Sequence, residues 1–168
     1  MQTKTKTKTR AAVIYLLITL VLVGIDQLTK YLVLQYMADG VPVTAIPHVL
    51  QFRYIYNTGA AFSMFSGRTL TLSAVTIAIL IVMIVLFIKG RFSTRLLRAG
   101  AILVIAGGFG NLIDRLFRHY VVDFIEFTFT QFAVFNFADC CVTIGAVLLI
   151  VAILISIAKD SGKEKQDH

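Results

Sequence analysis

Four long apolar runs dominate the sequence and constrain what the chain can fold into. Each is close to the roughly 20 residues that an α-helix needs to cross the hydrocarbon core of a bilayer. The runs cover about residues 11–35, 70–88, 96–113 and 139–158. Runs of this kind form helices in a bilayer, because every backbone polar group must find its partner within the segment. The sequence therefore predicts a mainly α, polytopic membrane protein with four transmembrane helices and a single membrane domain over residues 1–168.

The composition supports a membrane protein over a soluble one. Hydrophobic residues make up 58% of the chain and charged residues only 15%, whereas soluble domains carry about 25% charged residues. The net charge of +7 does not indicate a nucleic-acid partner, because the basic residues flank the apolar runs and form no stacking platform for bases. We therefore expect membrane lipids, and no nucleic acid, as partners.

Basic residues gather in three segments that four crossings place on one side of the membrane. The first apolar run is too long for the core of a cleaved signal peptide, so we interpret it as a retained helix. By the positive-inside rule the basic side is cytoplasmic, which puts both termini in the cytoplasm and the connections at about 36–69 and 114–138 outside. The basic residues concerned are Lys4, Lys6, Lys8, Arg10, Lys89, Arg91, Arg95, Arg98, Lys159, Lys163 and Lys165.

Both outward connections contain strand-like stretches. The stretch from His48 to Tyr56 is rich in β-branched and aromatic residues, and it ends at the turn signal Asn57-Thr58-Gly59. The stretch from Phe124 to Phe137 has a similar composition. The sequence therefore predicts a small β-cradle on the outer face. The aromatic residues of the first stretch either clamp a substrate or anchor the protein at the membrane interface.

Polar side chains collect at the predicted outer ends of the helices. Ionisable groups in membrane segments are costly and usually functional. A small transporter, the main alternative, should place such groups near the midplane and show inverted repeats, and neither is visible. The pattern therefore favours a site at the outer interface. Its candidate residues are Asp26, Lys30, Asn57, Asn111, Asp114, Arg115, Asp123, Asn136 and Asp139.

Asp123 and Asp139 are the strongest candidates for chemistry. Sixteen residues separate them, a spacing that fits a hairpin leaving the bilayer and returning. Two close carboxyls cannot both ionise comfortably, so they share a proton near neutral pH. The ionised member can accept a proton from water, and the neutral member can donate one. Alternatively, Asp139 caps a helix and Asp123 pairs with an arginine. Asn57 and Asn136 are either turn and cap residues or polar donors beside the pair.

The remaining charged candidates also have two interpretations. Asp26 and Lys30 lie one helical turn apart in the order that favours an ion pair, and direct contact with a ligand is the alternative. Asp114 is expected to cap or pair locally. Arg115 is expected to face a substrate carbonyl or a lipid group.

Other motifs point to packing rather than chemistry. The stretch Gly107–Gly110 lacks the spacing of a phosphate-binding loop and follows no strand of a βαβ unit, so it predicts close helix packing. Cys140 and Cys141 are interpreted as small apolar residues of a helix. The three histidines are scattered, and no zinc or serine-triad signature is present. We therefore expect no metal and no cofactor.

Five short motifs follow one another along nearly the whole chain. They read Asp26-Gln-Leu-Thr-Lys30, Asn57-Thr-Gly-Ala-Ala-Phe62, Gly107-Gly-Phe-Gly-Asn-Leu-Ile-Asp-Arg115, Val121-Val-Asp-Phe-Ile125 and Phe135-Asn-Phe-Ala-Asp139. In this order and topology the sequence resembles the lipoprotein signal peptidases, also called signal peptidase II, which are aspartyl endopeptidases of bacterial inner membranes.

The resemblance implies a specific activity and site. The family removes the signal peptide from bacterial prolipoproteins by cleaving before a lipobox cysteine that carries a diacylglyceryl group. By resemblance, Asp123 and Asp139 are the catalytic dyad, at the outer leaflet of the cytoplasmic (inner) membrane. The antibiotic globomycin is an expected inhibitor, and we expect a monomer. The residues that the resemblance places in or behind the site are Asn57, Gly59, Asn111, Arg115, Asn136, Asp26, Lys30 and Asp114.

Overall fold

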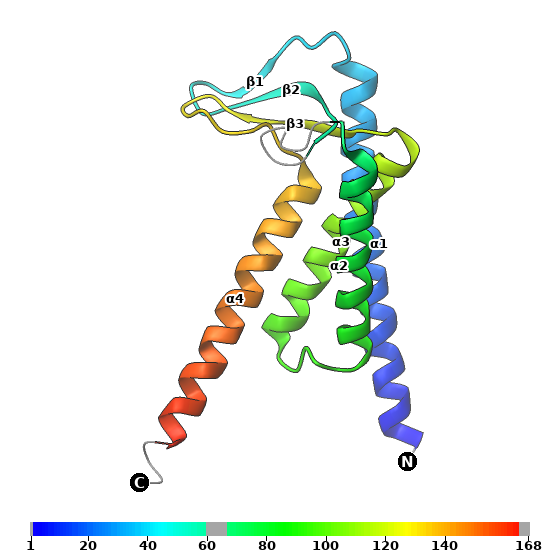
Figure 1. Ribbon diagram of the computed structural model, residues 1–168, viewed down its shortest axis with the longest axis vertical. Coiled ribbons are helices and arrows are strands. Elements are labelled where there is room, and N and C mark those ends of the chain that lie inside the picture. Colours follow the sequence, from blue (N-terminus) through cyan, green and yellow to red (C-terminus); the bar gives the residue numbers. More distant parts are fainter. Residues whose placement is uncertain (1, 60–66, 165–168) are drawn as a thin grey trace.

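The fold is a bundle of long helices with a small sheet across one end (Figure 1). The computed structural model describes residues 2–59 and 67–164. Within these residues it has four helices, each long and apolar enough to cross a membrane. They are α1 (Gln2–Tyr36), α2 (Thr69–Ile88), α3 (Arg95–Phe117) and α4 (Phe137–Glu164). The predicted mainly helical class with four membrane-spanning helices is confirmed.

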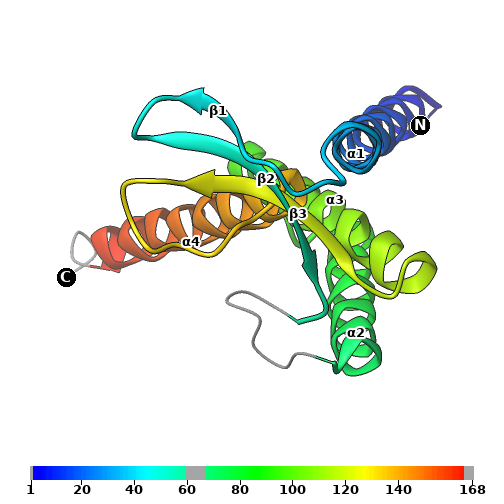
Figure 2. The same ribbon diagram turned by 90° about the horizontal axis from the view of Figure 1, so that it is seen from above.

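The sheet is antiparallel and has three strands among the described residues. The strands are β1 (Val43–Ile46), β2 (Leu50–Asn57) and β3 (Val121–Phe127). Their β-branched and aromatic side chains suit a pleated, half-buried surface. β2 is the central strand, and it pairs with β3 from Leu50 opposite Phe127 to Asn57 opposite Val121. Seen from above, the sheet lies across the ends of the helices (Figure 2). The predicted small sheet is confirmed.

The second strand-like stretch lies earlier in the chain than the sequence predicts. It was expected from Phe124 to Phe137, whereas β3 covers Val121–Phe127. The chain then turns back, and residue Phe135 forms an isolated bridge with Ile125. The aromatic residues after β3 therefore belong to a return loop that leads into α4, and composition alone does not separate such a loop from a strand.

The helices extend beyond the apolar runs. α3 continues past residue 113, where the apolar run ends, to Phe117, so Asp114 and Arg115 lie near the end of this helix. The reason is that Asp114 is fully buried and finds its hydrogen-bond partners inside the protein. α1 begins before residue 11 and α4 ends after residue 158, because a helix does not need apolar residues once it leaves the hydrocarbon core.

α3 is the central helix and lies between the other three (Figure 2). Its glycines permit the close approach. A Cβ atom on Gly107 would collide with the carbonyl oxygen of Ala138 in α4. Gly108 faces α2, and a Cβ atom on Gly110 would lie 2.6 Å from Oδ2 of Asp26 in α1. The glycine motif therefore packs helices together, as the sequence predicts.

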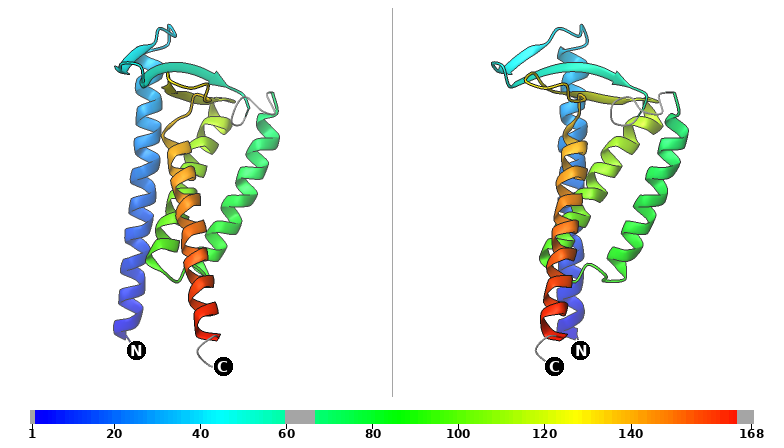
Figure 3. Two further views of the ribbon diagram at one scale, coloured as in Figure 1. Left: turned by 90° about the vertical axis from the view of Figure 1, so that its left-hand side faces the viewer. Right: turned by 60° about the vertical axis from the view of Figure 1, so that its left-hand side comes forward.

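The outward faces of the bundle are apolar. α1, α2 and α4 expose large hydrophobic side chains along their length, including those of Leu20, Ile81 and Leu154. Lipid tails are the solvent that such faces fit. α1 begins and α4 ends at the same end of the bundle, opposite the sheet (Figure 3). The sheet and the chain ends therefore mark the two opposite faces of the membrane domain.

Candidate active site

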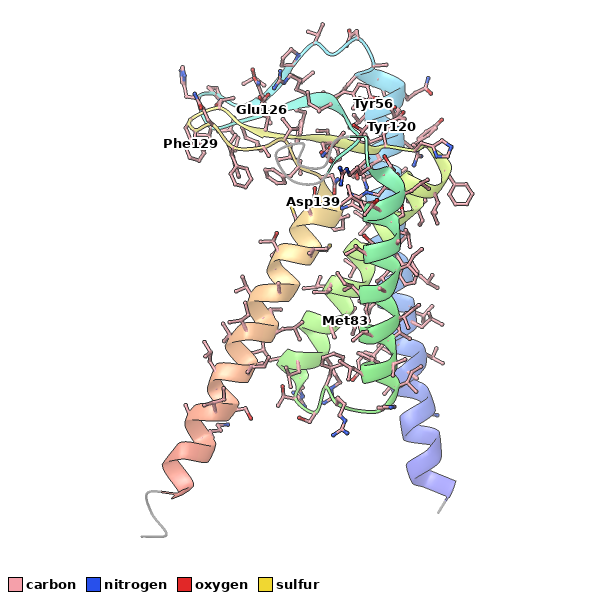
Figure 4. All side chains as sticks on the ribbon, in the orientation of Figure 1. Tyr56, Met83, Tyr120, Glu126, Phe129 and Asp139 are labelled. Atoms are coloured by element: carbon pink, nitrogen blue, oxygen red, sulfur yellow. The ribbon has the colours of Figure 1, made fainter. Side chains whose placement is uncertain are left out.

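A cavity of about 520 Å³ lies where α3, α4 and the sheet meet. Asp139, which lines it, lies at the sheet end of α4 (Figure 4). The cavity combines polar and apolar walls. Its polar lining includes Asn57, Asn111, Arg115, Asp123 and Asp139, and its apolar lining includes Phe127, Phe132, Phe135, Val142 and Ile144. Five of the residues that the sequence marked as candidates therefore share one cavity.

Asp123 reaches the cavity from β3 and is only 2% exposed. The Asn57 amide donates to one oxygen of its carboxyl at 2.6 Å, and the Asn136 amide donates to the other at 2.7 Å. Burial, followed by the negative charge of Asp139, raises the pKa of Asp123 to about 7, against the opposing effect of the two amide donors. Asp123 therefore retains a proton up to near neutral pH. The donors to its carboxyl are the side-chain amides of Asn57 and Asn136. The alternative that Asp123 pairs with an arginine does not describe these contacts.

Asp139 lies in the first turn of α4, where it and Asn136 hold each other. The backbone N–H of Asn136 donates to Oδ2 of Asp139 at 3.1 Å, and the backbone N–H of Asp139 donates to Oδ1 of Asn136 at 3.0 Å. This is a capping box in which Asn136 is the N-cap. The alternative that Asp139 is itself the cap is therefore wrong. Oδ1 of Asp139 instead accepts a hydrogen bond from the Asn111 amide at 2.7 Å.

Two buried asparagines connect the aspartates. Nδ2 of Asn136 donates to Asp123 and also, at 3.1 Å, to Oδ1 of Asn111. Nδ2 of Asn111 then donates to Asp139. The chain of hydrogen bonds therefore runs from one carboxyl to the other through two amides. Asn136 is both a cap residue and a polar donor, since its side-chain oxygen caps α4 while its side-chain nitrogen donates to Asp123.

Arg115 reaches from α3 to the turn that follows β2. Its Nη2 donates to the carbonyl oxygen of Gly59 at 3.2 Å, and the Gly59 N–H donates to Oδ1 of Asn57 at 2.8 Å. The Asn57 amide is thereby oriented with its nitrogen toward Asp123. Arg115 also lines the cavity beside both aspartates, where it supplies a positive charge. The motif continues through residues 60–62, which lie outside the described residues.

A buried ion network lies behind the cavity. Lys30 of α1 is fully buried, and its Nζ lies 2.9 Å from Oδ2 of Asp26 and 3.0 Å from Oδ2 of Asp114. The same Nζ donates to Oδ1 of Asn111 at 2.9 Å. Oδ1 of Asp26 accepts the backbone N–H of Ala138 at 2.9 Å. Buried charges of this kind require partners, and here they join α1, α3 and the start of α4. The ion-pair interpretation of Asp26 and Lys30 therefore holds.

Gln27 and Arg118 belong to the same network, and sequence reasoning missed both. Nη1 of Arg118 donates to Oδ1 of Asp114 at 2.5 Å and to Oε1 of Gln27 at 3.1 Å. Nε2 of Gln27 donates to the carbonyl oxygen of Gly110 at 3.0 Å. Arg118 follows Asp114 by one helical turn, and that spacing is the signal that identifies it. No comparable pattern marks Gln27.

Metal-binding side chains do not cluster in the part of the chain that the structure describes. No group of three or more His, Cys, Asp or Glu side chains there is arranged to hold a metal ion. Cys140 and Cys141 are free thiols in α4, and Cys140 lines the cavity beside Asp139. Asp123 and Asp139 are the carboxyl groups among the residues described as lining this cavity.

The fold and the paired carboxyls together define a membrane-embedded aspartyl peptidase. The sequence profile of one family of this class, described as Signal peptidase (SPase) II, matches residues 18–155. The chain belongs to this family, the lipoprotein signal peptidases, whose activity is the removal of signal peptides from prolipoproteins.

Curated relatives cover most of the chain. The lipoprotein signal peptidase of Lactobacillus johnsonii is 35% identical over 147 residues, which are 88% of this chain and 96% of the relative. That of Clostridium acetobutylicum is 40% identical over 151 residues, covering 87% of this chain and 98% of the relative. That of a Nostoc species is 42% identical over 130 residues, with 77% and 82% covered.

Two solved structures share the fold. One is a bacterial membrane enzyme determined by the in meso method at 2.3 Å, with a TM-score of 0.82 and 36% identity over 86% of this chain and 90% of the other. A second, determined in the same way at 1.9 Å, has a TM-score of 0.76 and 37% identity over 83% and 92% of the two chains. The chain is therefore similar to bacterial membrane enzymes along most of its length.

Proposed function

We propose that Asp123 and Asp139 are the catalytic dyad with which this enzyme cleaves prolipoproteins, and that the cut falls just before a lipobox cysteine bearing a diacylglyceryl group. The observation that carries the proposal is the bridge formed by Asn111 and Asn136, which links both carboxyls at one cavity. The pKa of about 7 for Asp123 supports it, because a shared-proton pair needs one carboxyl that stays neutral near physiological pH.

The reaction uses one ionised and one protonated carboxyl. The ionised aspartate removes a proton from a water molecule, whose oxygen bonds to the scissile carbonyl carbon. The protonated aspartate gives its proton to the carbonyl oxygen, which yields a neutral gem-diol. As the gem-diol collapses, the C–N bond breaks and the leaving nitrogen takes the proton that the water lost. A gem-diol hydroxyl returns a proton to the other aspartate, so the dyad ends as it began.

The residues around the dyad have supporting roles in this proposal. Arg115 stabilises the oxygen that gains electron density in the transition state, because its guanidinium group lines the cavity beside both carboxyls. Asn57 and Asn111 keep the carboxyls oriented, and Gly59 joins Asn57 to Arg115. The ion network around Lys30 supports these donors from behind.

The cavity fits a substrate that is part peptide and part lipid. Phenylalanine side chains and the apolar residues of α4 line it together with the polar groups. The apolar outer faces of the helices open onto the bilayer that holds the acyl chains of such a substrate. We therefore propose a diacylglyceryl-modified prolipoprotein as substrate, membrane lipids as surroundings and globomycin as an inhibitor. The enzyme acts as a monomer in this proposal.

The membrane orientation follows from the charges. The connection between α2 and α3 carries Lys89 and Arg91, and the first turn of α3 carries Arg95 and Arg98, at the end of the bundle away from the sheet. By the positive-inside rule this end is cytoplasmic, together with both termini. The sheet and the site then lie at the outer leaflet of the bacterial cytoplasmic membrane, where a scissile bond meets water while its lipid stays in the bilayer.

A cleavage assay tests this function. Purified enzyme in detergent is incubated with a lipidated precursor and with the same precursor lacking the diacylglyceryl group, and the products are identified by mass spectrometry. We expect cleavage immediately before the modified cysteine and poor turnover of the unlipidated precursor. Equal turnover of both precursors would contradict lipid recognition, and a cut elsewhere would contradict the assigned bond.

A further inference from the structure

Lys30 uses all its hydrogen-bonding capacity inside the protein. An ammonium group has three N–H donors, and three acceptors surround Nζ of Lys30 within 3.0 Å: a carboxylate oxygen of Asp26, a carboxylate oxygen of Asp114 and the amide oxygen of Asn111. The residue is 0% exposed. The first two contacts balance charge. The third goes to a neutral amide that faces the dyad, and charge balance alone does not require it.

The contact with Lys30 fixes how the Asn111 amide is turned. Oδ1 of Asn111 accepts from Lys30 at 2.9 Å and from Asn136 at 3.1 Å. With its oxygen held by two donors, the amide has only its nitrogen to present to Asp139, and Nδ2 donates to Oδ1 of that residue at 2.7 Å. The opposite rotamer would place two N–H groups against a cation and a lone pair against a carboxylate. Lys30 therefore polarises the amide that donates to Asp139.

The two aspartates have different surroundings as a result. Asp139 accepts one hydrogen bond from this polarised amide and one from a backbone N–H in the first turn of α4, where the helix dipole favours a negative charge. Asp123 is almost fully buried on β3, and burial favours the neutral form of a carboxyl. These different surroundings favour an ionised carboxylate at Asp139 and a neutral carboxyl at Asp123.

We propose that Lys30 is a positioning residue of the reaction: acting through Asn111, it holds Asp139 as the ionised member that accepts the proton of water and leaves the shared proton on Asp123. This assignment rests on the proposed dyad. Lys30 is fully buried behind the cavity, so it acts through Asn111. The charged groups that face the dyad and its supports are Lys30 and Asp26 from α1, and Asp114, Arg115 and Arg118 from α3.

The test is the pH–rate profile of a charge-balanced variant. In Lys30→Met combined with Asp26→Asn, one buried cation and one buried anion are removed together, and the asparagine oxygen can still accept the N–H of Ala138. Loss of the nearby cation disfavours ionisation of the pair, so both limbs of the profile should move up by about one pH unit. We also expect kcat to fall about 10- to 100-fold, with KM for the lipidated precursor unchanged, because a misplaced catalytic group costs rate rather than binding.

A comparison variant removes a different ion pair of the network, the one between Arg118 and the buried Asp114. Arg118→Met combined with Asp114→Asn also removes one cation and one anion, although the Arg118 side chain is 27% exposed. It leaves Lys30 and its contact with Asn111 in place, and the new amide oxygen at position 114 can still accept from Lys30. Its thermal stability should fall, but its pH–rate profile should coincide with that of the parent enzyme after scaling. A purely structural role for Lys30 would make the two double variants behave alike, and equal profiles in both would overturn the proposal.

Lys30→Arg provides a second test that keeps the buried positive charge. Its profile should coincide with that of the parent after scaling, and a shifted profile in a folded Lys30→Arg enzyme would contradict the role of the charge. The aspartate variants separate this result from the function itself. If Asp123→Asn and Asp139→Asn both stay active, the dyad fails and the role of Lys30 fails with it. If both are inactive while the Lys30 double variant keeps the parent profile, only the role of Lys30 fails.

Discussion

Asn136 and Asp139 hold each other through two reciprocal hydrogen bonds, each from the backbone N–H of one to the side-chain oxygen of the other, at 3.1 and 3.0 Å. This capping box forms the N-terminus of α4 and also orients the Asp139 side chain. The side-chain nitrogen of Asn136 extends further, to Asp123 at 2.7 Å. Asn136 therefore both starts the helix and orients the two carboxyls, and a suitable substitution can separate these two roles.

Replacing Asn136 by serine should separate the cap from the amide bridge. Serine is a good N-cap and keeps the oxygen that the N–H of Asp139 needs, so the free energy of unfolding should change by no more than about 1 kcal/mol. Serine lacks the nitrogen that reaches Asp123, and loss of one such preorganised donor should lower kcat on the order of 100-fold. Initial rates and thermal unfolding in detergent measure both effects. A serine variant as fast as the parent would show that the bridge is not needed.

The alanine variant at the same position is the control. Asn136→Ala removes cap and bridge together, so it should lose both activity and about 1 kcal/mol or more of stability. If serine and alanine variants were equally unstable, the cap would contribute nothing to the start of α4.

The raised pKa of Asp123 predicts how the rate depends on pH. Burial and the charge of Asp139 raise this pKa to about 7. The carboxyl that donates a proton must be neutral, so kcat/KM should decrease as the pH rises through about 7. A profile that stayed flat to well above that pH would contradict a buried aspartate as the proton donor.

The same pKa predicts a change in stability. The pKa of Asp123 rises from 3.8 to about 7 on folding, so between these values the native state binds more protons than the unfolded chain. The preferential protonation of Asp123 in the folded state stabilises the protein. This stabilisation is fully present below pH 3.8 and is lost as the pH rises through about 7. Asp123→Asn does not titrate there, so its melting temperature relative to the parent should rise between about pH 5 and about pH 9. A constant difference would contradict the shift.

Much of the fold was predictable because a bilayer restricts its spanning segments to apolar helices of about 20 residues. Length and hydropathy are enough to predict four spanning helices, and the glycines of Gly107–Gly110 are enough to predict close packing. The strand after Val121 was less predictable. Its residues and those of the return loop have the same aromatic and β-branched composition, and pairing with β2 decides which of them form the strand.

The sequence was enough to predict which residues form the candidate site, but not the hydrogen bonds between them. The sequence shows that Asp123, Asn136 and Asp139 collect at one end of the helices. It does not show that one asparagine caps α4 and serves the site at once, because that depends on how the amide is turned. Gln27 was missed for a related reason, since its role depends on contacts with residues far away in the chain.

Close packing of α3 against α4 predicts a strong effect of a small substitution. A Cβ atom on Gly107 would meet the backbone oxygen of Ala138 and a side-chain atom of Val142 at 2.8 Å. Gly107→Ala should therefore destabilise the protein by about 1–3 kcal/mol, as overpacking does, and should reduce activity because Ala138 neighbours Asp139. Thermal unfolding in detergent is the measurement.

Gly24→Ala is the matched control for this substitution. Nothing lies within 4 Å of a Cβ atom built on Gly24 in α1, so alanine should be neutral there or stabilising by up to about 1 kcal/mol. If Gly24→Ala and Gly107→Ala were equally destabilising, helix packing would not explain the effect at Gly107.

A strong chelator should leave the cleavage rate unchanged. The proposed reaction needs only the two carboxyls and water, and no metal-binding cluster occurs among residues 2–59 and 67–164. The assay compares initial rates with and without the chelator, followed by addition of zinc. Activity that was lost with chelator and regained with zinc would contradict the aspartyl mechanism.

The most direct measurement of the central claim is cleavage of a lipidated precursor by Asp123→Asn and Asp139→Asn enzymes. Asn is nearly isosteric with Asp but cannot exchange the proton, so each variant should fold, insert and lose at least about 1,000-fold in kcat. Asp39→Asn, at an exposed aspartate outside the cavity, is the control and should keep the parent rate. Near-parent cleavage by either of the first two variants would contradict the dyad.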